Sequence, residues 1–399
     1  MMRKYDFDKV VDRTKFFSAK WSMGKALIDM GYTERFDEDT ISVFTADMDF
    51  ECPDSMKEAC HRVADHNIYG YCWLTPDNCD YFPALTDWFK TKRNWEFTPD
   101  DVTYVPSTID AIKFAIECLT GNGDGIIINQ PIYTPFSSTI RKTGRKVVNS
   151  QLINTDGYYT VDFEDFEKKA ADEHVTAFIL CNPHNPTGRV WTDGELKRMV
   201  EICRQNGVIV IADEIHGDLC RMDVAFHPVA TVCGPEGIVA MTSLNKTFNM
   251  AGLQAANVVI QDPKLRRLYQ DYVGVIMPNI FTIAAVIAAY REGDEWLQQV
   301  REYLDGTIDW VLDFLKERLP KVKCRRPEGT YILWMDFREY GLTAEEIHQK
   351  IYIEANLVLE GGREFDPEHG AGFERMCIPT RRSLVQEAFE RMAKAFENC

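Results

Sequence analysis

The chain has 399 residues, a formal net charge of −17 and a hydrophobic fraction of 45%. This length exceeds what one hydrophobic core usually organises, so we expect two packed lobes or domains. The acidic excess argues against nucleic acid and anionic membranes as partners, because both are bound by clustered Lys and Arg.

The cysteines and the hydropathy pattern indicate a cellular location. Twelve cysteines are scattered along the chain without a CxxC pair, which is typical of reduced thiols in a cytosolic protein. His61, His66, Cys72 and Cys79 lie close in sequence, but their spacing fits no standard zinc template, so we expect no metal site. No apolar run has the length of a signal peptide or a membrane span. The sequence therefore predicts a cytoplasmic protein.

The first two thirds of the chain contain an arm and then a regular alternation. Residues 1–50 are expected to pack with a smaller C-terminal domain or to reach a second subunit. In residues 51–285, short apolar runs alternate with amphipathic stretches, which predicts a mostly parallel sheet covered by helices. The clearest expected strands are 125–129, 176–181, 207–213 and 237–241, and the clearest helices are 110–119 and 193–206.

The pattern changes near residue 286. Long amphipathic helices are expected at 295–319 and 383–397, with a strand pair near 329–337 between them. Residues 286–399 are therefore predicted to form a smaller α+β domain together with the N-terminal arm. The fold class is α/β.

A rigid polar loop follows one of the predicted strands. The string CNPHNPTG occupies residues 181–188 directly after an apolar run. Two prolines restrict its backbone and two asparagines offer amide donors. In open α/β sheets, ligands bind at the carboxyl ends of the strands. Taken alone, the string is also compatible with an ordinary Asn-Pro turn.

The next two strands end in polar residues as well. The run at 207–213 leads into Asp213, Glu214 and His216, and the run at 237–241 leads into Ser243 and Lys246. Three consecutive strand–helix units thus deliver polar groups to one edge of the sheet. This repetition predicts a functional site there.

These strings resemble a known family. They are similar to fold-type I enzymes of the aminotransferase class I/II superfamily, which use pyridoxal 5′-phosphate (PLP), and more closely to the cystathionine β-lyase-like C–S lyase branch. The strings are ADMDF (46–50), YGY (69–71), PIYTPF (131–136), NPHNPTGRVW (182–191), DEIH (213–216) and KTFNMAGL (246–253). The resemblance implies a PLP-dependent transferase-like large domain and an amino acid substrate.

The resemblance implies roles around the cofactor ring. Lys246 would carry the cofactor aldehyde and move the Cα proton, which requires an amine of lowered pKa. Asp213 would pair with the pyridine nitrogen, and Asn185 would donate to the phenolic oxygen. Tyr133 would stack on the ring, and His216 stands where many aminotransferases have a tyrosine. Each of these residues also has a plainer interpretation. Lys246 could be a surface lysine and Asp213 a helix cap. Tyr133 could be a core aromatic residue and His216 a packing residue.

The same resemblance implies a phosphate site. Backbone N–H groups of Ser107, Thr108 and Ile109 at a helix start, joined by the Ser243 hydroxyl, would bind the cofactor phosphate. Tyr71 resembles a tyrosine that reaches this phosphate from a neighbouring subunit. A homodimer with active sites at the subunit interface is therefore expected.

Substrate binding is assigned by resemblance to Arg375, Ala46 and Asn185. A planar guanidinium suits an α-carboxylate, although a surface arginine is the alternative for Arg375. Some positions depart from the family pattern. At the expected phosphate site, Ser107 occupies a position where the family usually has glycine. Asp110 adds a carboxylate near the same site, which would repel the phosphate dianion if the side chain pointed inward. Gln254 replaces a phosphate-binding arginine of many aminotransferases, which favours the C–S lyase branch, and MCIPT follows Arg375.

The residues themselves do not settle which reaction follows proton removal. By resemblance, we expect β-elimination from cystathionine or another S-substituted cysteine, which yields a thiol, pyruvate and ammonia. Aminotransfer to a 2-oxo acid is the main alternative. A regulatory PLP-fold protein without turnover is a third possibility, but its usual signs are an added DNA-binding module or loss of the lysine, and neither is seen.

Overall fold

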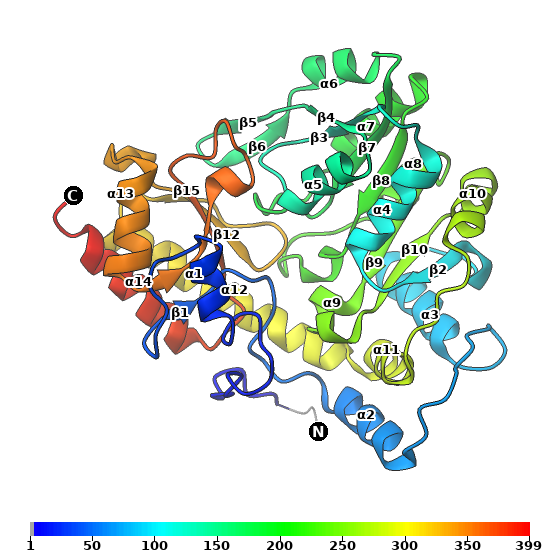
Figure 1. Cartoon of the computed structure of the whole chain (residues 1–399), viewed down its shortest axis with the longest axis horizontal. Coiled ribbons are helices and arrows are strands. Elements are labelled where there is room, and N and C mark those ends of the chain that lie inside the picture. Colours follow the sequence, from blue (N-terminus) through cyan, green and yellow to red (C-terminus); the bar gives the residue numbers. More distant parts are fainter. Residues whose placement is uncertain (1–3) are drawn as a thin grey trace.

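The computed structural model describes residues 4–399. Figure 1 shows a large twisted sheet with helices on both faces, beside a smaller layer of strands and helices that contains the C-terminus. The large sheet has seven strands, and β10 alone runs antiparallel to its neighbours. Their spatial order is β2 (Val102–Val105), β10 (Ala256–Val259), β9 (Ile238–Ser243), β8 (Ile209–Asp213), β7 (Val175–Cys181), β3 (Gly125–Ile128) and β4 (Lys146–Asn149).

The continuous apolar runs of these strands are explained by burial of both faces of the sheet. In β8, Val210 and Ala212 belong to one buried cluster and Ile211 belongs to another. Successive side chains of a strand point to opposite faces, so both faces need apolar cover. One face is covered by α4 (Thr108–Leu119), α5 (Thr134–Lys142) and α10 (Pro263–Val273). The other cluster includes residues of α3 (Tyr81–Arg93), α6 (Phe163–Ala170), α7 (Asp193–Gln205), α8 (Val229–Cys233) and α11 (Ile280–Glu292).

The predicted strands and helices of this sheet are found, with small shifts at their ends. Helix α4 begins at Thr108 rather than at residue 110, because the Ser107 side chain caps it by accepting a hydrogen bond from the Asp110 N–H. Helix α7 begins where expected, at Asp193, since Thr192 and Glu195 form a capping box.

A second, four-stranded antiparallel sheet lies in the C-terminal part. Its order is β11 (Lys323–Cys324), β12 (Ile332–Asp336), β15 (Phe373–Cys377) and β14 (Glu360–Gly361). The strand pair predicted near 329–337 is wrong, because this range holds only β12, which pairs with β11 and with the distant β15. Long helices flank this sheet, namely α12 (Asp294–Arg318) and α14 (Arg382–Phe396).

The N-terminal arm contacts both parts of the molecule. Strand β1 (Ile41–Ser42) pairs with β13 (Leu357–Val358), whereas Phe7 packs edge-on against Phe50 and Trp296 in the core cluster of the large sheet. The arm thus spans the two lobes that flank the carboxyl ends of the parallel strands. The remaining elements are α1 (Gly24–Asp29), α2 (Asp54–His66), β5 (Leu152–Thr155), β6 (Tyr158–Val161), α9 (Leu244–Thr247), α13 (Ala344–His348), a π-helix (Gln349–Glu354) and 3-10 turns at Pro99–Asp101, Gly217–Leu219, Ala251–Leu253, Arg338–Tyr340 and Gly362–Glu364.

Candidate active site

The polar loops predicted to meet at the sheet edge do so. In the strand register, Asp213 lies beside Cys181 on one side and Met241 on the other. Adjacent strands are about 4.8 Å apart, so the chain that follows each of these residues starts at the same level of the sheet. The loops that contain Asn185, His216 and Lys246 therefore leave from one rim.

Lys246 points into the space between the sheet and the N-terminal arm. Its Nζ donates a hydrogen bond to the carbonyl oxygen of Ala46 at 2.6 Å, and the Tyr331 hydroxyl donates to the same oxygen at 2.9 Å. Burial lowers the pKa of Lys246, and the charge of Arg375 acts in the same direction, whereas nearby acidic groups oppose the shift. A larger fraction of such a lysine than of an exposed one is neutral near pH 7, so more of it is available to act as a nucleophile or a general base.

Asp213 provides a buried carboxylate near this amine. The residue is 5% exposed, and its carboxylate accepts a hydrogen bond from the Ile215 N–H at 3.2 Å. Burial raises its pKa to about 6, while the Ile215 bond and the charge of Lys246 pull the pKa back down. The carboxylate is thus placed where a cationic partner would stabilise it strongly.

Arg375 and Asn185 are brought together from opposite lobes. Arg375 lies on β15 and is 2% exposed, and its Nη1 donates to Oδ1 of Asn185 at 3.2 Å. Its Nη2 donates to the carbonyl oxygen of Phe44 at 2.9 Å and to Oε2 of Glu360. Of the two predicted interpretations of Arg375, the surface arginine is wrong.

His216 lies at the same rim with an unused ring nitrogen. The side chain is buried, and its ring meets the Tyr331 ring edge-on at a centroid distance of 5.8 Å. Its Nδ1 has no hydrogen-bond partner within residues 4–399. Burial lowers the pKa of His216 well below its usual value, and the charges of Lys246 and Arg375 add to this effect, so the ring is neutral.

Tyr133 is anchored to the Asn185 loop. Its backbone N–H donates to the carbonyl oxygen of Asn185 at 3.1 Å, and its ring packs edge-on against Phe136. Burial raises the pKa of the Tyr133 hydroxyl, and the charges of Arg375 and Asp213 also act on it. The tyrosine therefore faces the same group of charged residues as Lys246.

The predicted phosphate-binding residues lie at one level of the sheet. Val105, two residues before Ser107, and Ser243 both pair with Ala256 of β10, so the start of α4 and Ser243 flank the same strand end. The Ser107 hydroxyl donates to Asp110 at 2.7 Å, and the Ser243 hydroxyl donates to the carbonyl oxygen of Ala255 at 2.6 Å. The Asp110 carboxylate thus accepts a hydrogen bond from Ser107, the N-cap residue of its own helix.

Tyr71 is placed differently from the other predicted residues. Its side chain is fully exposed, in a hollow that is also lined by Ile68 of the same loop and by Ile280 and Ala284 of α11. No hydrogen bond within residues 4–399 joins its hydroxyl to the sheet edge.

Sequence reasoning missed Tyr331 and Glu360, and it noted Cys377 only within a departing string. Cys377 is buried near Lys246, and its thiol contacts the Phe44 carbonyl oxygen at 3.5 Å. All three belong to the chain around the small sheet, in segments without a polar motif. Glu360 lies directly opposite Arg375 in the pairing of β14 with β15. Knowledge of this strand pairing is the signal that would have found Glu360.

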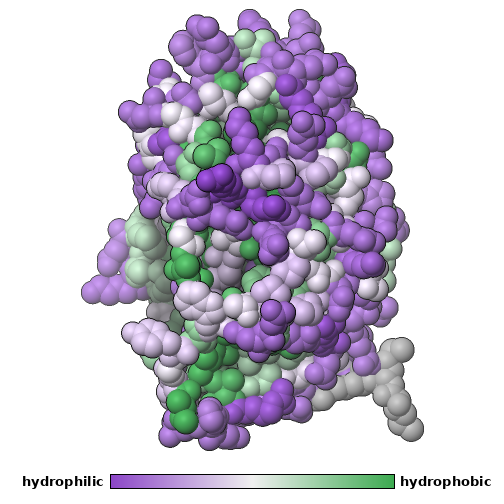
Figure 2. All heavy atoms as spheres, turned by 90° about the vertical axis from the view of Figure 1, so that its right-hand side faces the viewer, coloured by the Kyte–Doolittle hydropathy of each residue, from purple (hydrophilic) through white to green (hydrophobic). Residues whose placement is uncertain are grey.

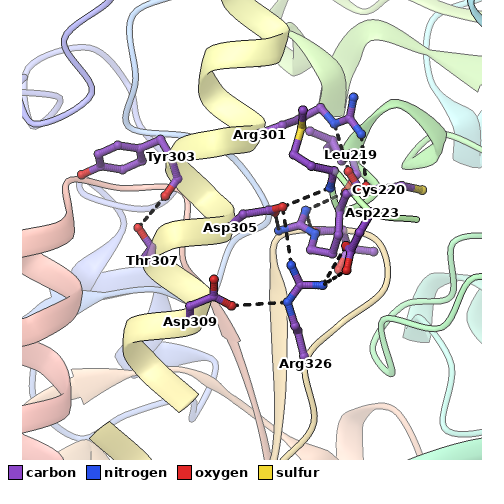
Figure 3. Close-up of polar contacts among 12 residues, drawn as sticks. Leu219, Cys220, Asp223, Arg301, Tyr303, Asp305, Thr307, Asp309 and Arg326 are labelled. Carbon is purple, nitrogen blue, oxygen red and sulfur yellow. Dashed lines mark hydrogen bonds and ion pairs between the residues drawn. The ribbon is translucent and has the colours of Figure 1, made fainter. Parts of the chain in front are cut away.

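A buried ion pair lies next to the segments that carry His216 and Tyr331. Arg221, close after His216, pairs with Asp305 of α12 at 2.9 Å, and its Nη2 donates to the carbonyl oxygen of Thr330 at 2.6 Å. Figure 3 shows Asp305 and Arg326 pointing toward one another. Nη2 of Arg326 lies 3.6 Å from Oδ2 of Asp305. Because Thr330 precedes Tyr331, the network fixes the backbone that presents the Tyr331 side chain.

Comparison with known proteins identifies the chain. The sequence model described as "Aminotransferase class I and II" matches residues 46–392. The chain belongs to this family. Cystathionine beta-lyase PatB of Bacillus subtilis (strain 168) is 35% identical over 398 residues, which cover 98% of this chain and 99% of PatB. Protein MalY of Escherichia coli (strain K12) is 28% identical, with 98% of each chain covered.

Solved structures of this family have the same fold. A PLP-bound putative aminotransferase from Clostridium difficile 630 is 35% identical with a TM-score of 0.92, and it covers 98% of this chain and 100% of its own. Cystalysin from Treponema denticola, which contains a pyridoxal 5′-phosphate cofactor, is 28% identical with a TM-score of 0.93. The match covers 99% of this chain and 100% of the cystalysin chain. A PLP-bound C–S lyase from Staphylococcus hominis is 29% identical with a TM-score of 0.91, covering 98% of each chain. The PLP-dependent transferase-like fold is thereby confirmed.

Two features of the described residues concern metal binding and membrane insertion. Among the described residues, no three His, Cys, Asp or Glu side chains are grouped so that they could hold a metal ion. None of the helices within residues 4–399 is both long and apolar enough to cross a membrane.

Proposed function

We propose that the protein is a PLP-dependent C–S β-lyase that cleaves cystathionine or related S-substituted cysteines to a thiol, pyruvate and ammonia. The observation that carries the proposal is the lysine amine of lowered pKa held at Ala46, with Asp213 and Arg375 near enough to act on its charge. Two relatives that cover 98% of this chain, cystathionine beta-lyase PatB and the C–S lyase of Staphylococcus hominis, have names that favour elimination, whereas a third is named a putative aminotransferase.

The residues of the rim fit PLP. Asp213 is a carboxylate whose pKa is raised by burial, and a protonated ring nitrogen would supply a cationic partner that lowers it. Two buried nitrogen atoms on the loops of this rim, Nδ1 of His216 and Nδ2 of Asn182, have no hydrogen-bond partner within residues 4–399. The N-terminus of α4 offers backbone N–H groups to a phosphate. We therefore assign phosphate binding to Ser107, Thr108, Ile109 and Ser243.

Each side chain then has a task. When bound, PLP supplies an electron sink for the pair of electrons left at the substrate Cα. Lys246 would hold the cofactor through its aldehyde, and its amine could take the Cα proton of the substrate, because its lowered pKa leaves a fraction of the amine neutral. Asp213 would keep the ring nitrogen protonated, and Asn185 would donate to the phenolic oxygen. Tyr133 would stack against the ring, and His216 would line the same part of the site.

Substrate orientation is assigned to three residues. Arg375, a buried planar cation, holds the α-carboxylate, and Asn185 fixes the guanidinium through its Oδ1. The Ala46 carbonyl oxygen accepts a hydrogen bond from the Lys246 amine and would hold this amine near the substrate when it is not bonded to the cofactor. The chain of contacts thus keeps the base and the carboxylate site at a fixed separation.

A homodimer completes the proposal. Ile68, Tyr69, Tyr71 and Trp73 follow α2 and are exposed by 58% or more. Of these, Ile68 and Tyr71 line the hollow between α2 and α11. Figure 2 shows hydrophobic side chains gathered in the lower part of the face seen from the right of Figure 1. Exposed apolar patches of this kind are typical of subunit contacts. We assign Tyr71 to the cofactor phosphate of the second subunit, and light scattering of the purified protein should give twice the monomer mass.

The domain division and the location are also proposals. We divide the chain into an arm (1–50), a large PLP-binding domain (51–285) and a small domain (286–399), although α11 crosses the second boundary. The twelve cysteines are all free thiols, which suits the reducing cytoplasm.

The reaction type is tested by supplying cystathionine to the purified holoenzyme without any 2-oxo acid. The proposal predicts equal amounts of pyruvate and free thiol, released over many turnovers. If turnover instead requires 2-oxoglutarate or pyruvate as an acceptor, the enzyme is an aminotransferase.

A further inference from the structure

Arg375 already has a carboxylate partner. Its Nη2 contacts Oε2 of Glu360, while its other contacts, the Phe44 carbonyl and the Asn185 amide, are uncharged. Nε has no hydrogen-bond partner among residues 4–399. Glu360 is also the one carboxylate of the described residues that makes an ion pair with this guanidinium. The positive charge that would attract a substrate carboxylate is therefore compensated by the protein itself.

The two partners are held unequally. Glu360 lies directly opposite Arg375 in the pairing of β14 with β15, so the ion pair is a cross-strand contact. The side chain of Arg375 is 3% exposed, whereas that of Glu360 is 18% exposed and lies on a two-residue strand at the sheet edge. Glu360 can thus turn toward water, and Arg375 cannot.

We propose that Glu360 competes with the α-carboxylate of the substrate for Arg375 and so sets the affinity for amino acid substrates. The inference rests on the proposed function, which assigns Arg375 to that carboxylate. Two carboxylates at one guanidinium repel each other, so Glu360 must withdraw when the substrate binds. The free energy needed to displace Glu360 therefore reduces the net free energy of substrate binding to Arg375.

Replacing Glu360 by glutamine removes the competing charge and keeps an oxygen acceptor for Nη2. The KM for an S-substituted cysteine should fall about tenfold, the size expected for one partly exposed charge pair, while kcat changes less than about twofold. Glu360→Asp keeps the charge on a shorter side chain and should lower KM by less. Glu364→Gln is the matched control, because this exposed glutamate lies four residues further along the chain, in the 3-10 turn after β14, and forms no ion pair with Arg375 within residues 4–399.

A binding measurement separates this inference from the reaction itself. The ligand 3-(methylthio)propionate has the carboxylate and thioether of a cysteine conjugate but no amino group, so it cannot react. Titration calorimetry with the holoenzyme should show it binding about tenfold more tightly to Glu360→Gln than to wild type, and its methyl ester should show no such gain. This outcome stands even if the enzyme proves to be an aminotransferase.

Two results would overturn the inference. A higher or unchanged KM in Glu360→Gln, in a variant that melts at the wild-type temperature, would mean that Glu360 orients Arg375 rather than competing for it. An equal gain for the acid and the ester would mean that the substitution opens the pocket without acting on the carboxylate.

Discussion

Lys246 and Tyr331 donate to one acceptor, the carbonyl oxygen of Ala46, at 2.6 and 2.9 Å. This shared acceptor joins the large sheet, the small sheet and the N-terminal arm at the reacting amine. Lys246 lies 200 residues and Tyr331 lies 285 residues after Ala46, so the position of the amine depends on segments that are distant in sequence.

Tyr331→Phe should impair turnover without unfolding the protein. The substitution removes the hydroxyl that fixes the Ala46 carbonyl, and the loss of one such hydrogen bond corresponds to about a tenfold decrease in kcat. Steady-state kinetics and a visible absorbance spectrum of the bound cofactor check this. Tyr272→Phe, which removes an exposed hydroxyl bonded to Glu117, is the control and should behave as wild type. An unchanged kcat in Tyr331→Phe would contradict the positioning role.

Asp213→Asn should have opposite effects on activity and stability. The amide cannot pair with a ring nitrogen, so kcat should fall by about 100-fold or more. In the cofactor-free protein, burial raises the pKa of Asp213 to about 6, so its charge costs stability as the pH rises from about 4 through 6. The cofactor-free variant should therefore be more stable than wild type by about 3 kcal/mol at pH 8 and about equal to it at pH 4. Urea denaturation at both pH values measures this, and a variant that is less stable at pH 8 would refute the account.

Glu374→Gln should remove a pH dependence of stability. Burial raises the pKa of Glu374 from 4.5 to about 8, and Tyr352 donates to its carboxyl at 2.8 Å. The folded state holds this proton more tightly than the unfolded state, so wild-type stability is full below pH 4.5 and declines as the pH rises to about 8. The free energy of unfolding of the variant should exceed that of wild type by about 5 kcal/mol at pH 9 and match it at pH 4.5. Exposed Glu368→Gln should show no such difference in urea titrations at the two pH values.

Arg221→Met should destabilise the protein through an uncompensated carboxylate. Arg221 is 0% exposed and pairs with Asp305, whose remaining partners are the Met222 N–H and a more distant Arg326. Loss of one member of a buried ion pair typically costs about 3–5 kcal/mol. Chemical denaturation should also show that Arg221→Met/Asp305→Leu recovers a large part of this loss. A double variant no more stable than the single one would contradict the explanation.

The sequence predicted the large sheet and much of its rim because the signals there are local. Strands β7, β8 and β9 are continuous apolar runs, and each ends in the polar residues that form the site. Parallel strands in one sheet place those ends together, so Asn185, Asp213 and Lys246 could be grouped before any coordinates were known.

The small sheet was not predictable in the same way. Strand β12 pairs with β15 about 40 residues later, and no local pattern records which distant strand will be its neighbour. Glu360 and Tyr331 enter the site through these pairings, so both were missed. The arm residue Ala46 was found only through its family string, since its contribution is a backbone carbonyl that any residue could provide.

The central claim is that Lys246 carries the cofactor of this enzyme. The most direct measurement is to reduce the PLP-loaded protein with borohydride, digest it and locate the added pyridoxyl mass by peptide mass spectrometry. The account predicts that the peptide containing Lys246 alone carries the addition, and that Lys246→Ala carries none and forms no thiol from cystathionine. Attachment to a different lysine, or thiol formation by Lys246→Ala at the wild-type rate, would contradict it.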